Sequence, residues 1–450
     1  MSIVDLKHTT KNLKNGGMVM ILDTGAVIDP ESEAMIQALH SRSTGGVKKH
    51  LEILAKKGAK DFMANFYVGY GHKSIGDCGS ITLFVEGISM LAAKAIQDWA
   101  LYSGQESSTR YVDFSTQAFI DPVGSKESQE ILEAWRQFYL ESMAPLNDYL
   151  KQRFPIQAEE KEVIYNKAIA ARAFDIMRGF LPAGASTNIA WHSNMRQVAD
   201  KIALLRHHPL EEVREIAATI KVALLERYPS SFDHPIFDTT ENYNEEWMKN
   251  DYYFVHEEYT EVELLKNSVD KNLLKNYQNI LSSRPMKTEL PKFVAECGYV
   301  QFGFMLDFGS FRDLQRHRAI IQRMPLLSTK HGFADFYLNS LPEDIKNKAQ
   351  AFIKNQEEKI KNLNIAPELA QYYTAMGYNL PNRITGDLAA LVYLIELRAT
   401  RFVHPTLQKR AIQMAEILKT EFADCGLKLH LDDDPGRFDV RRGEHDIVMK

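Results

Sequence analysis

The stretch YVQFGFMLDFGSFRDLQRHRAIIQR (Tyr299–Arg323) joins an alternating apolar segment to a cluster of cations. The apolar alternation of its first part, Tyr299–Phe308, is typical of a half-buried strand, and the residues that follow have the spacing of a helix. Gly309 lies near the strand end, and Ser310 with Asp313 predicts a capping box for the helix. The stretch therefore predicts a strand that runs directly into a helix, with the cations after it.

A second strand-to-helix pattern lies about 200 residues earlier in the chain. Its strand is Ser80–Ser89, and the sequence MLAAKAIQDWAL follows as the helix. Each pattern is followed downstream by a Leu-Pro pair, Leu181-Pro182 or Leu380-Pro381, and then by a helical segment that ends in Leu-Arg. The repetition in one order indicates an internal duplication with divergent halves.

The segment between the halves, Tyr228–Tyr253, is acidic, aromatic and rich in turn-forming residues, which predicts a domain boundary. We expect two domains, residues 1–235 and residues 236–450. Amphipathic patterns predict long helices at Glu127–Phe154, Glu160–Gly179, Leu210–Arg227, Glu258–Leu281, Pro342–Leu363 and Thr406–Phe422. The expected fold class is α/β or α+β with helix in excess.

The composition describes an ordinary globular protein and excludes several classes. The 450 residues are 45% hydrophobic and 25% charged, and the net charge of -5 argues against nucleic-acid binding. Three cysteines far apart, with no CxxC pair, argue against a zinc site or a disulfide framework and suit a reducing cytoplasm. No apolar run approaches the roughly 18 residues of a membrane span, and the N-terminus lacks the apolar core of a signal peptide. We therefore expect a cytoplasmic protein with no metal, membrane or nucleic-acid partner.

The cation triplet Arg316-His317-Arg318 has two interpretations. Cations near a helix C-terminus favour the helix dipole, and the histidine could simply bond a carbonyl. Successive helix positions point about 100° apart, however, so the three side chains would fan out toward different partners, which suits a ligand with several acceptors. Composition alone leaves both interpretations open.

The segment YSGQESSTRY (Tyr102–Tyr111) combines hydroxyl groups, backbone N–H groups and one arginine. This combination suits a phosphate monoester, although a solvated loop with Ser and Thr turns would have the same composition. Farther along, Arg178 precedes a Leu-Pro pair, and Asn194 and Arg196 lie two residues apart. Alone, these residues indicate no more than the polar face of a helix.

Together, these segments resemble the flavin-dependent thymidylate synthase family. The signature of that family is an Arg-His-Arg triplet at a helix end, followed closely by Ser, Asn/Gln-Glu, Ser and Arg-Tyr. The first half of this chain holds the back end of the signature: Ser103, Gln105, Glu106, Ser108, Arg110 and Tyr111. It has Asp98-Trp99-Ala100 where the triplet should stand, whereas the second half has the triplet and lacks the Glu, Ser and Arg-Tyr.

Flanking features extend the resemblance. In the first half they are the GHKS segment (Gly71–Ser74), Arg178, Thr187, Trp191, Asn194, Arg196 and Leu205-Arg206. The second half keeps Leu380-Pro381 and Leu397-Arg398 and has Gly377 where Arg178 would have its counterpart. The resemblance covers roughly Met35–Pro229 and Pro291–Phe422, and it implies two tandem domains, each a small antiparallel sheet packed by long helices.

The resemblance implies reductive methylation of dUMP to dTMP, with FAD as cofactor and with NADPH and methylenetetrahydrofolate as co-substrates. By position in the family motifs, the residues that would bind FAD are Arg316, His317, Arg318, Ser74, His72, Glu106, Asn194 and Arg196. Those that would bind the nucleotide are Gln105, Glu106, Ser108, Thr109, Arg110 and Arg178. The arginine that polarises the pyrimidine would be Arg206 or Arg398, and Arg316 could reach the nucleotide as well. Asp200 stands near a position where the family uses Asn.

Active sites of that family lie at interfaces of a tetramer, which gives the divided signature a meaning. Two copies of the duplicated chain would form a homodimer equivalent to a tetramer, a pseudo-tetramer with four positional sites. Two of these sites would combine first-half and second-half residues and be complete. Two alternatives stay open: a different C5 modification of a pyrimidine nucleotide on the same flavin scaffold, and a degenerate, non-catalytic flavin- or nucleotide-binding protein.

Overall fold

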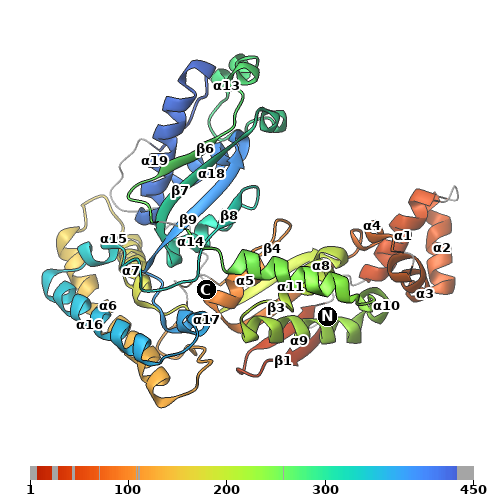
Figure 1. Cartoon of the computed structure of the whole chain (residues 1–450), viewed down its shortest axis with the longest axis horizontal. Helices are drawn as coiled ribbons and strands as arrows, with labels where there is room; N and C mark the ends of the chain where they lie inside the picture. The colour runs from red at the N-terminus through yellow and green to blue at the C-terminus, as the bar shows by residue number, and fades with distance from the viewer. Residues whose placement is uncertain are drawn as a thin grey trace. The chain divides into compact units, whose positions relative to one another are not determined.

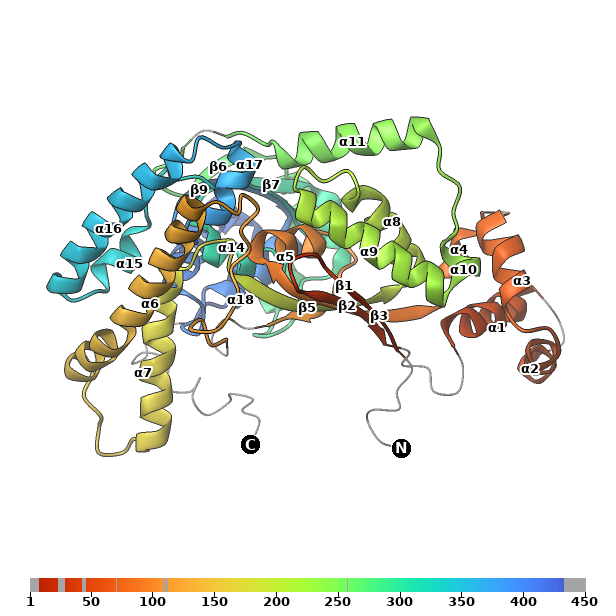
Figure 2. The ribbon, with the colours of Figure 1, turned by 90° about the horizontal axis from the view of Figure 1, so that it is seen from below.

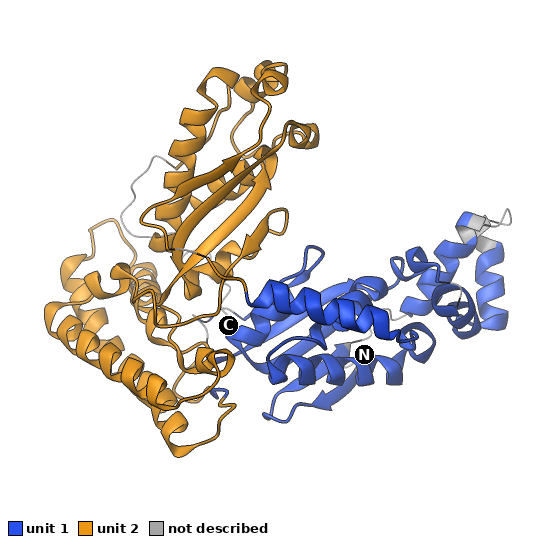
Figure 3. Cartoon of the chain, viewed as in Figure 1, with its two compact units in different colours: residues 1–112, 118–120, 185–253 blue, residues 113–117, 121–184, 254–450 orange. Residues whose placement is uncertain are grey.

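The computed structural model describes residues 8–22, 29–42, 46–69, 71–107, 109, 112–256 and 258–432. They form a mixed fold of helices and two antiparallel sheets, which confirms the expected class (Figures 1 and 2). The chain divides into two compact units (Figure 3). Unit 1 comprises residues 1–112, 118–120 and 185–253, and unit 2 comprises residues 113–117, 121–184 and 254–450.

Unit 1 is built on a five-stranded sheet with the order β1-β2-β3-β5-β4. Its strands are β1 (His8–Asn12), β2 (Met18–Leu22), β3 (Ser80–Ser89), β4 (Ser103–Glu106) and β5 (Ser186–Asn194). Along β3, Ile81, Leu83 and Val85 are buried on one face, which is the alternation that predicted this strand. β3 and β5 pair along most of their length, so the sheet brings the ends of both strands together.

Three helices cover one face of this sheet (Figure 2). They are α5 (Met90–Gln97), α8 (Met195–Leu205) and α9 (Glu211–Arg227). The remaining elements of unit 1 are α1 (Pro30–Arg42), α2 (Gly46–Lys57), α3 (Lys60–Phe62), the π-helical turn η2 (Met63–Gly69), α4 (Lys73–Gly76), α10 (Pro229–Phe232) and α11 (Asp238–Tyr252). The expected boundary segment Tyr228–Tyr253 thus forms two helices of unit 1, and the change of unit falls at its end.

Unit 2 contains the second sheet, with the order β6-β7-β9-β8. Its strands are β6 (Glu263–Asn267), β7 (Tyr299–Asp307), β8 (Ile321–Arg323) and β9 (Asn379–Asp387). Two helices, α18 (Leu388–Arg398) and α19 (Pro405–Glu421), pack against it over an apolar core that includes Phe302, Phe304 and Leu391. The predicted strand Tyr299–Phe308 is confirmed within one residue.

Two expectations for unit 2 are wrong. The helix predicted at Glu258–Leu281 is instead β6 followed by two short helices, α12 (Lys271–Lys275) and α13 (Gln278–Ser283), because β6 gains backbone partners along β7. The capping box at Ser310 is also wrong. The cap of α14 (Phe308–Leu314) is Asp307, whose Oδ2 accepts a hydrogen bond of 2.9 Å from the backbone N–H of Ser310.

Helices from both halves of the sequence build the rest of unit 2. They are α6 (Lys126–Arg153), α7 (Glu162–Met177), α15 (Asp335–Asn339), α16 (Glu343–Asn362) and α17 (Pro367–Ala370), with the 3₁₀ turns η4 (Arg178–Phe180), η5 (Lys292–Cys297), η6 (Gln371–Tyr373) and η7 (Ala423–Cys425). Trp135 of α6 is fully buried and donates from Nε1 to the Tyr373 carbonyl at 2.9 Å. The rings of Phe138 and Phe352 stack with centroids 4.5 Å apart. The compact units therefore differ from the expected halves 1–235 and 236–450, because α6 and α7 pack with second-half residues.

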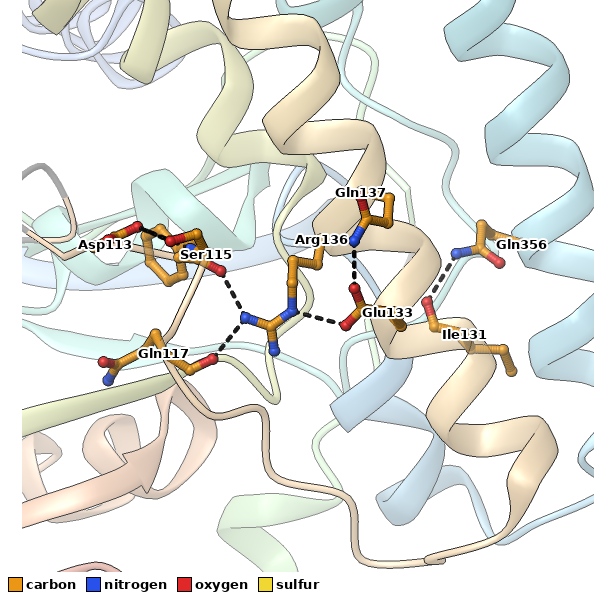
Figure 4. A network of polar contacts seen from close by, with 9 residues as sticks. Asp113, Ser115, Gln117, Ile131, Glu133, Arg136, Gln137 and Gln356 are labelled. Atoms are coloured by element: carbon orange, nitrogen blue, oxygen red, sulfur yellow. Dashed lines mark hydrogen bonds and ion pairs between the residues drawn. The ribbon is translucent and has the colours of Figure 1, made fainter.

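Polar contacts of α6 also hold the segment 113–117 in unit 2 (Figure 4). Arg136 donates from Nη1 to the carbonyls of Phe114 and Gln117, at 2.6 and 2.8 Å. On another side of α6, the Gln356 amide donates to the Ile131 carbonyl at 3.0 Å. These bonds join α6 to the segment 113–117 and to Gln356 of α16.

The two sheets repeat one arrangement. The order β2-β3-β5-β4 in unit 1 matches β6-β7-β9-β8 in unit 2. Ser103, the first residue of β4, pairs with His192 of β5, and Ile321, the first residue of β8, pairs with Thr385 of β9. His192 and Thr385 each stand two residues before the end of their strand. The same spacing places Asp98-Trp99-Ala100 where the second half has its triplet, in agreement with the equivalence drawn from the resemblance.

A reciprocal backbone pattern joins the segments 179–184 and 372–377 inside unit 2. The four hydrogen bonds are Ala183 N–H to Thr374 O at 2.9 Å, Met376 N–H to Leu181 O at 2.8 Å, Gly184 N–H to Tyr372 O at 2.9 Å and Gly377 N–H to Gly179 O at 2.8 Å. Exchange of the two segments reproduces the same set, so Leu181 is equivalent to Thr374, and Gly184 to Gly377. The equivalence expected between the two Leu-Pro pairs is therefore wrong, since Leu380-Pro381 lies within β9, and Gln371 is the counterpart of Arg178.

Candidate functional site

A cavity of about 490 Å³ opens in unit 1 beside α8. Its floor is apolar and includes Ile202, Leu224 and Phe232. Its charged lining comprises Lys73, Arg196, Asp200, Arg206, Lys221 and Glu241. Two residues expected at a ligand site, Arg196 and Arg206, therefore line one cavity, together with Gly71 and Lys73 of the GHKS segment.

Cations of this cavity are held by carboxylates of the same unit. Arg196 donates from Nε to Oδ1 of Asp77 at 2.7 Å and keeps a third of its side chain exposed. Lys73 lies 3.5 Å from Asp200, which stands near a position where the resemblance leads us to expect Asn. These ion pairs fix the cations around an apolar floor, which is an arrangement suited to a ring that carries an anionic group.

Arg206 ends α8 and faces a helix that begins 32 residues later. Its Nη2 donates to Oε1 of Glu241 on α11, and His207 Nε2 lies 2.9 Å from the other carboxylate oxygen. Arg206 Nε is buried and has no hydrogen-bond partner among the described residues. One carboxylate thus holds two neighbouring cation-forming side chains at the cavity.

Several other first-half residues expected at the site neighbour the lining residues along the chain or lie on β4, whereas Arg178 lies in unit 2. His72 and Ser74 alternate with the lining residues Gly71 and Lys73 along the chain. Asn194 caps α8 through Oδ1, which accepts from Gln197 N–H at 2.9 Å. Other expected residues are Gln105, which is exposed, Glu106, which accepts from Gln97 at 3.0 Å, and Thr109, which is buried. Ser108 and Arg110 lie outside the described residues.

The triplet lies in unit 2, in the turn just past the end of α14. Arg316 and Arg318 are exposed, whereas His317 is buried with 6% of its surface accessible. Arg316 Nη2 lies 3.7 Å from Oδ1 of Asp313, one helical turn before it. The two arginines therefore present positive charge at the surface, and the histidine anchors the turn.

His317 is held in one protonation state and one tautomer. Arg398 donates from Nε to Nε2 of His317 at 2.7 Å, and because a guanidinium can only donate, Nε2 must be unprotonated. Burial and the charge of Arg398 lower the pKa of His317 to about 3. At neutral pH the ring is therefore uncharged, with its proton on Nδ1.

Asp313 is the common counter-ion of this region. Burial acts to raise the pKa of Asp313, but Arg178, Arg316, Arg398 and also Arg312 outweigh it and hold the pKa below its usual range. The backbone carbonyl of Asp313 also accepts a bond of 2.7 Å from Arg398 Nη2. Asp175 and Asp307 also lie near Arg178, so these four arginines exceed the three carboxylates by one positive charge, which suits a phosphate-bearing ligand.

Arg178 connects the family-like first half to this cluster within unit 2. Only 9% of its surface is exposed, and its Nη2 donates to Ser310 Oγ at 3.2 Å. Burial alone would lower the pKa of Arg178, yet Tyr337 and Asp175, with the other carboxylates nearby, raise it, so the group stays charged. A contact between Arg178 and a nucleotide phosphate stays a prediction, since the described partners of this guanidinium are protein groups.

Ser310, His404 and Thr406 form a buried network behind the cluster. His404 Nε2 lies 3.1 Å from the Asp175 carbonyl and must donate to it, so Nδ1 accepts from the Ser310 or Thr406 hydroxyl, at 3.0 and 2.9 Å. Burial, followed by the nearby charge of Arg178, lowers the pKa of His404 to about 4. The network resembles a nucleophile with its base, but Ser310 has no accessible surface, so its role is to support α14.

The positions that lack signature residues have acquired other contacts. In unit 2, Arg323 occupies the strand position of Gln105, and its guanidinium lies 4.5 Å from the ring of Phe254, with that of Arg383 at 4.8 Å. Both arginines line a cleft of about 520 Å³. In unit 1, Lys201 on α8 donates to the Asp98 carbonyl at 2.7 Å in the turn that replaces the triplet.

Sequence reasoning missed Asp313 and Glu241 as site residues. Asp313 stands three residues before Arg316, and this spacing on a helix predicts an ion pair. Glu241 stands 35 residues from Arg206 in a segment expected to be a boundary, and no local signal connects the two.

Comparison with known proteins agrees with this geometry. Residues 27–230 match the family described as thymidylate synthase complementing protein. The chain is similar to a UPF0159 protein of Chlamydia muridarum, with 26% identity over 419 residues that cover 80% of this chain and 78% of that protein. A UPF0159 protein of Thermoplasma acidophilum is 23% identical over 476 residues, which cover 89% of this chain and 93% of its own.

One further finding concerns membranes. Within the part of the chain that the structure describes, none of the helices combines the length and the apolar character needed to cross a bilayer.

The resemblance drawn from the divided signature is confirmed by the match over residues 27–230. Through residues 27–230, the chain is similar to the thymidylate synthase complementing protein family, which is the family of flavin-dependent thymidylate synthases.

Proposed function

We propose that this protein is an FAD-dependent thymidylate synthase that methylates dUMP to dTMP, with methylenetetrahydrofolate and NADPH as co-substrates. The observation that carries the proposal is the meeting of Arg178 with Arg316 and Arg398 around Asp313. Arg178 comes from the family-matched segment, and the other two arginines come from the half that retains the triplet. Family residues from both halves thus lie in one cluster, which favours a retained ligand site over a degenerate protein.

The residues present fit a flavin dinucleotide. Two exposed arginines of the triplet offer charge-assisted hydrogen bonds to a diphosphate, and the unit 1 cavity offers an apolar floor with cations at its rim. Arg316, His317 and Arg318 would hold FAD from one side. Ser74, His72, Glu106, Asn194 and Arg196 would hold it from the other.

FAD, when bound, would supply the one-carbon transfer and the redox chemistry of the reaction, with methylenetetrahydrofolate and NADPH as co-substrates. The protein would orient the nucleotide and stabilise the charge that develops on the pyrimidine. Arg206 is the better candidate for this contact, since it lines the cavity, whereas Arg398 shares its hydrogen bonds with His317 and the Asp313 carbonyl. The rest of dUMP would be held by the other expected nucleotide-binding residues, which are Gln105, Glu106, Ser108, Thr109, Arg110 and Arg178.

The two residue sets suggest how chains would pair. We propose a cytoplasmic homodimer, equivalent to a tetramer of single domains, in which one protomer supplies the cavity residues and its partner supplies the triplet. The positions that have lost signature residues, at Asp98 in unit 1 and at Arg323 in unit 2, would then face each other at the remaining sites. Because protein groups occupy these positions, we infer that the remaining sites no longer bind the ligands.

The test is release of tritium from [5-³H]dUMP by the purified flavoprotein in the presence of NADPH and methylenetetrahydrofolate. We expect tritium release together with formation of dTMP, identified by its mass. A flavin-containing protein that releases no tritium from dUMP under these conditions would overturn the proposal.

A second candidate is a different C5 modification of a pyrimidine nucleotide. It is favoured by Asp200, which stands near a position where the family uses Asn and which places a carboxylate in the cavity lining. Tritium release with a product heavier than dTMP by one oxygen would support this candidate and exclude simple methylation.

A further inference from the structure

One wall of the unit 1 cavity comes from outside the family-matched residues. The match ends at residue 230, and the lining residues beyond it are Phe232, His234, Pro235, Ile236, Phe237, Thr240, Glu241 and Asn244. These residues form one wall, here called the added wall, of a cavity whose other lining residues lie in the family-matched segment. Glu241 is the charged member of that wall.

The added wall is fixed to α8 by packing. Asn244 and Met248 of α11 are buried, and the ring of Tyr252 contacts His208 at the end of α8 with centroids 4.7 Å apart. Glu241 lies in the first turn of α11, one turn before Asn244. The helix thus holds the Glu241 carboxylate at the end of α8, where Arg206 and His207 emerge.

The carboxylate takes the place that a ligand anion would occupy. Its Oε1 accepts from Arg206 Nη2, and its Oε2 lies 2.9 Å from His207 Nε2. A fifth of the Glu241 side chain and a quarter of the Arg206 side chain stay accessible, and both line the cavity. A phosphate or an ionised pyrimidine at Arg206 would meet this carboxylate as a like charge.

We propose that Glu241 is an internal counter-ion that an anionic ligand of this cavity must displace from Arg206. The identity of the ligand as a nucleotide monophosphate rests on the proposed function. The displacement itself rests only on the position of Glu241. Only protein molecules in which Arg206 is released from Glu241 can bind an external anion. The apparent affinity for the anion is therefore reduced in proportion to the fraction of such molecules.

The proposal predicts that the effect of a Glu241 substitution on binding depends on the charge of the ligand. Glu241→Gln removes the charge but keeps the size and one acceptor oxygen, so Arg206 loses a competitor rather than its surroundings. We expect binding of dUMP and of inorganic pyrophosphate to strengthen about 5–10-fold, which corresponds to a partly exposed ion pair of about 1 kcal/mol. Deoxyuridine, which has no phosphate, should bind within about twofold of its wild-type affinity.

The experiment is a calorimetric titration of the full-length flavoprotein with dUMP, deoxyuridine and pyrophosphate. The matched control is Glu245→Gln, one turn farther along α11, where the exposed carboxylate pairs with Lys249 outside the cavity lining. The control should leave all three affinities unchanged. A double variant, Arg206→Gln with Glu241→Gln, should bind dUMP no more tightly than Arg206→Gln alone.

Equal dUMP and pyrophosphate affinities in the wild type and in Glu241→Gln would overturn the proposal, as would absence of anion binding to both proteins. If Glu241→Gln lowers the melting temperature without changing either affinity, Glu241 only attaches α11, and the proposal again fails. Tighter pyrophosphate binding with no turnover of dUMP would support the counter-ion while rejecting the synthase function, so the two failures are distinguishable.

Discussion

Arg398 and His317 share a hydrogen bond of 2.7 Å in which the guanidinium donates and the imidazole accepts. The cation of this pair cannot lose its proton in the accessible pH range, so the buried histidine stays uncharged. The positive charge that the triplet shows to a ligand therefore comes from Arg316 and Arg318. His317 sets the position of the turn between them.

Arg398→Ala should weaken FAD binding about 10-fold. The variant leaves the buried Nε2 of His317 without its donor and frees the Asp313 carbonyl, so the turn that carries Arg316 and Arg318 loses its anchor. The measurement is the dissociation constant of FAD, taken from the quenching of flavin fluorescence. Lys409→Ala, which removes an exposed cation from α19, is the control, and equal FAD affinities in the two variants would contradict the anchor.

Stability should fall in mild acid because of His317 and His404. Their pKa values in the folded state are about 3 and about 4, below the ordinary 6.5 of an unfolded chain. The unfolded state therefore takes up protons first. The contribution of these histidines is fully present above pH 6.5 and is lost as the pH falls from 6.5 toward about 4, at about 1.4 kcal/mol per pH unit for each.

The measurement is the free energy of unfolding in urea at pH 7.5 and pH 5.5, for the wild type and for His404→Asn. The asparagine can keep one donor and one acceptor but does not titrate. The loss of stability between the two pH values should be about 1.4 kcal/mol smaller in the variant. An identical loss in both proteins would show that His404 takes up its proton normally in the folded state.

Arg178→Met should destabilise the protein by about 3–5 kcal/mol. The methionine fills similar space but leaves Asp175, Asp307 and Asp313 without the guanidinium that compensates their buried charge. Urea unfolding at neutral pH measures the change. Arg153→Met, at the end of α6, is the control and should cost less than about 0.5 kcal/mol, because an exposed arginine contributes little. A loss below 1 kcal/mol for Arg178→Met would mean that the carboxylates do not depend on it.

Mixing two inactive variants should restore activity if partner chains complete each site. Arg196→Ala disables the cavity set, and Arg318→Ala disables the triplet. In a mixed dimer, one site would combine the intact cavity of one chain with the intact triplet of the other. Because half of randomly formed dimers are mixed and each has one of two sites working, about a quarter of the wild-type tritium release should return. No recovery after the dimers are dissociated and reassembled together would place each site within one chain.

The sequence predicted the elements whose patterns are strong and local. The strands at Ser80 and Tyr299 and the long helices α6, α7, α9, α16 and α19 were predicted to within a few residues, because apolar periodicity survives in them. β6 was predicted as a helix, since an edge strand of five residues owes its form to pairing with β7. The Leu-Pro repeat was misleading because a dipeptide carries too little information to fix a register.

The site was predictable in its residue types and not in its contacts. Arg398 and His317 were each named from the family resemblance, but a bond between residues 81 apart in the chain follows only from the packing of α18 beside α14. The Arg206 contact with Glu241 was hidden for the same reason. Asp313 alone had a local signal, its helical spacing from Arg316.

The four reciprocal backbone bonds between the segments 179–184 and 372–377 have a consequence for how the chain can be made and altered. Either half expressed alone could complete this exchange only with a second copy of itself, whereas pairing of the unlike halves requires them in equal numbers. A single continuous chain guarantees that one-to-one stoichiometry at every concentration. With unlike halves always supplied together, each half can lose residues that the other retains.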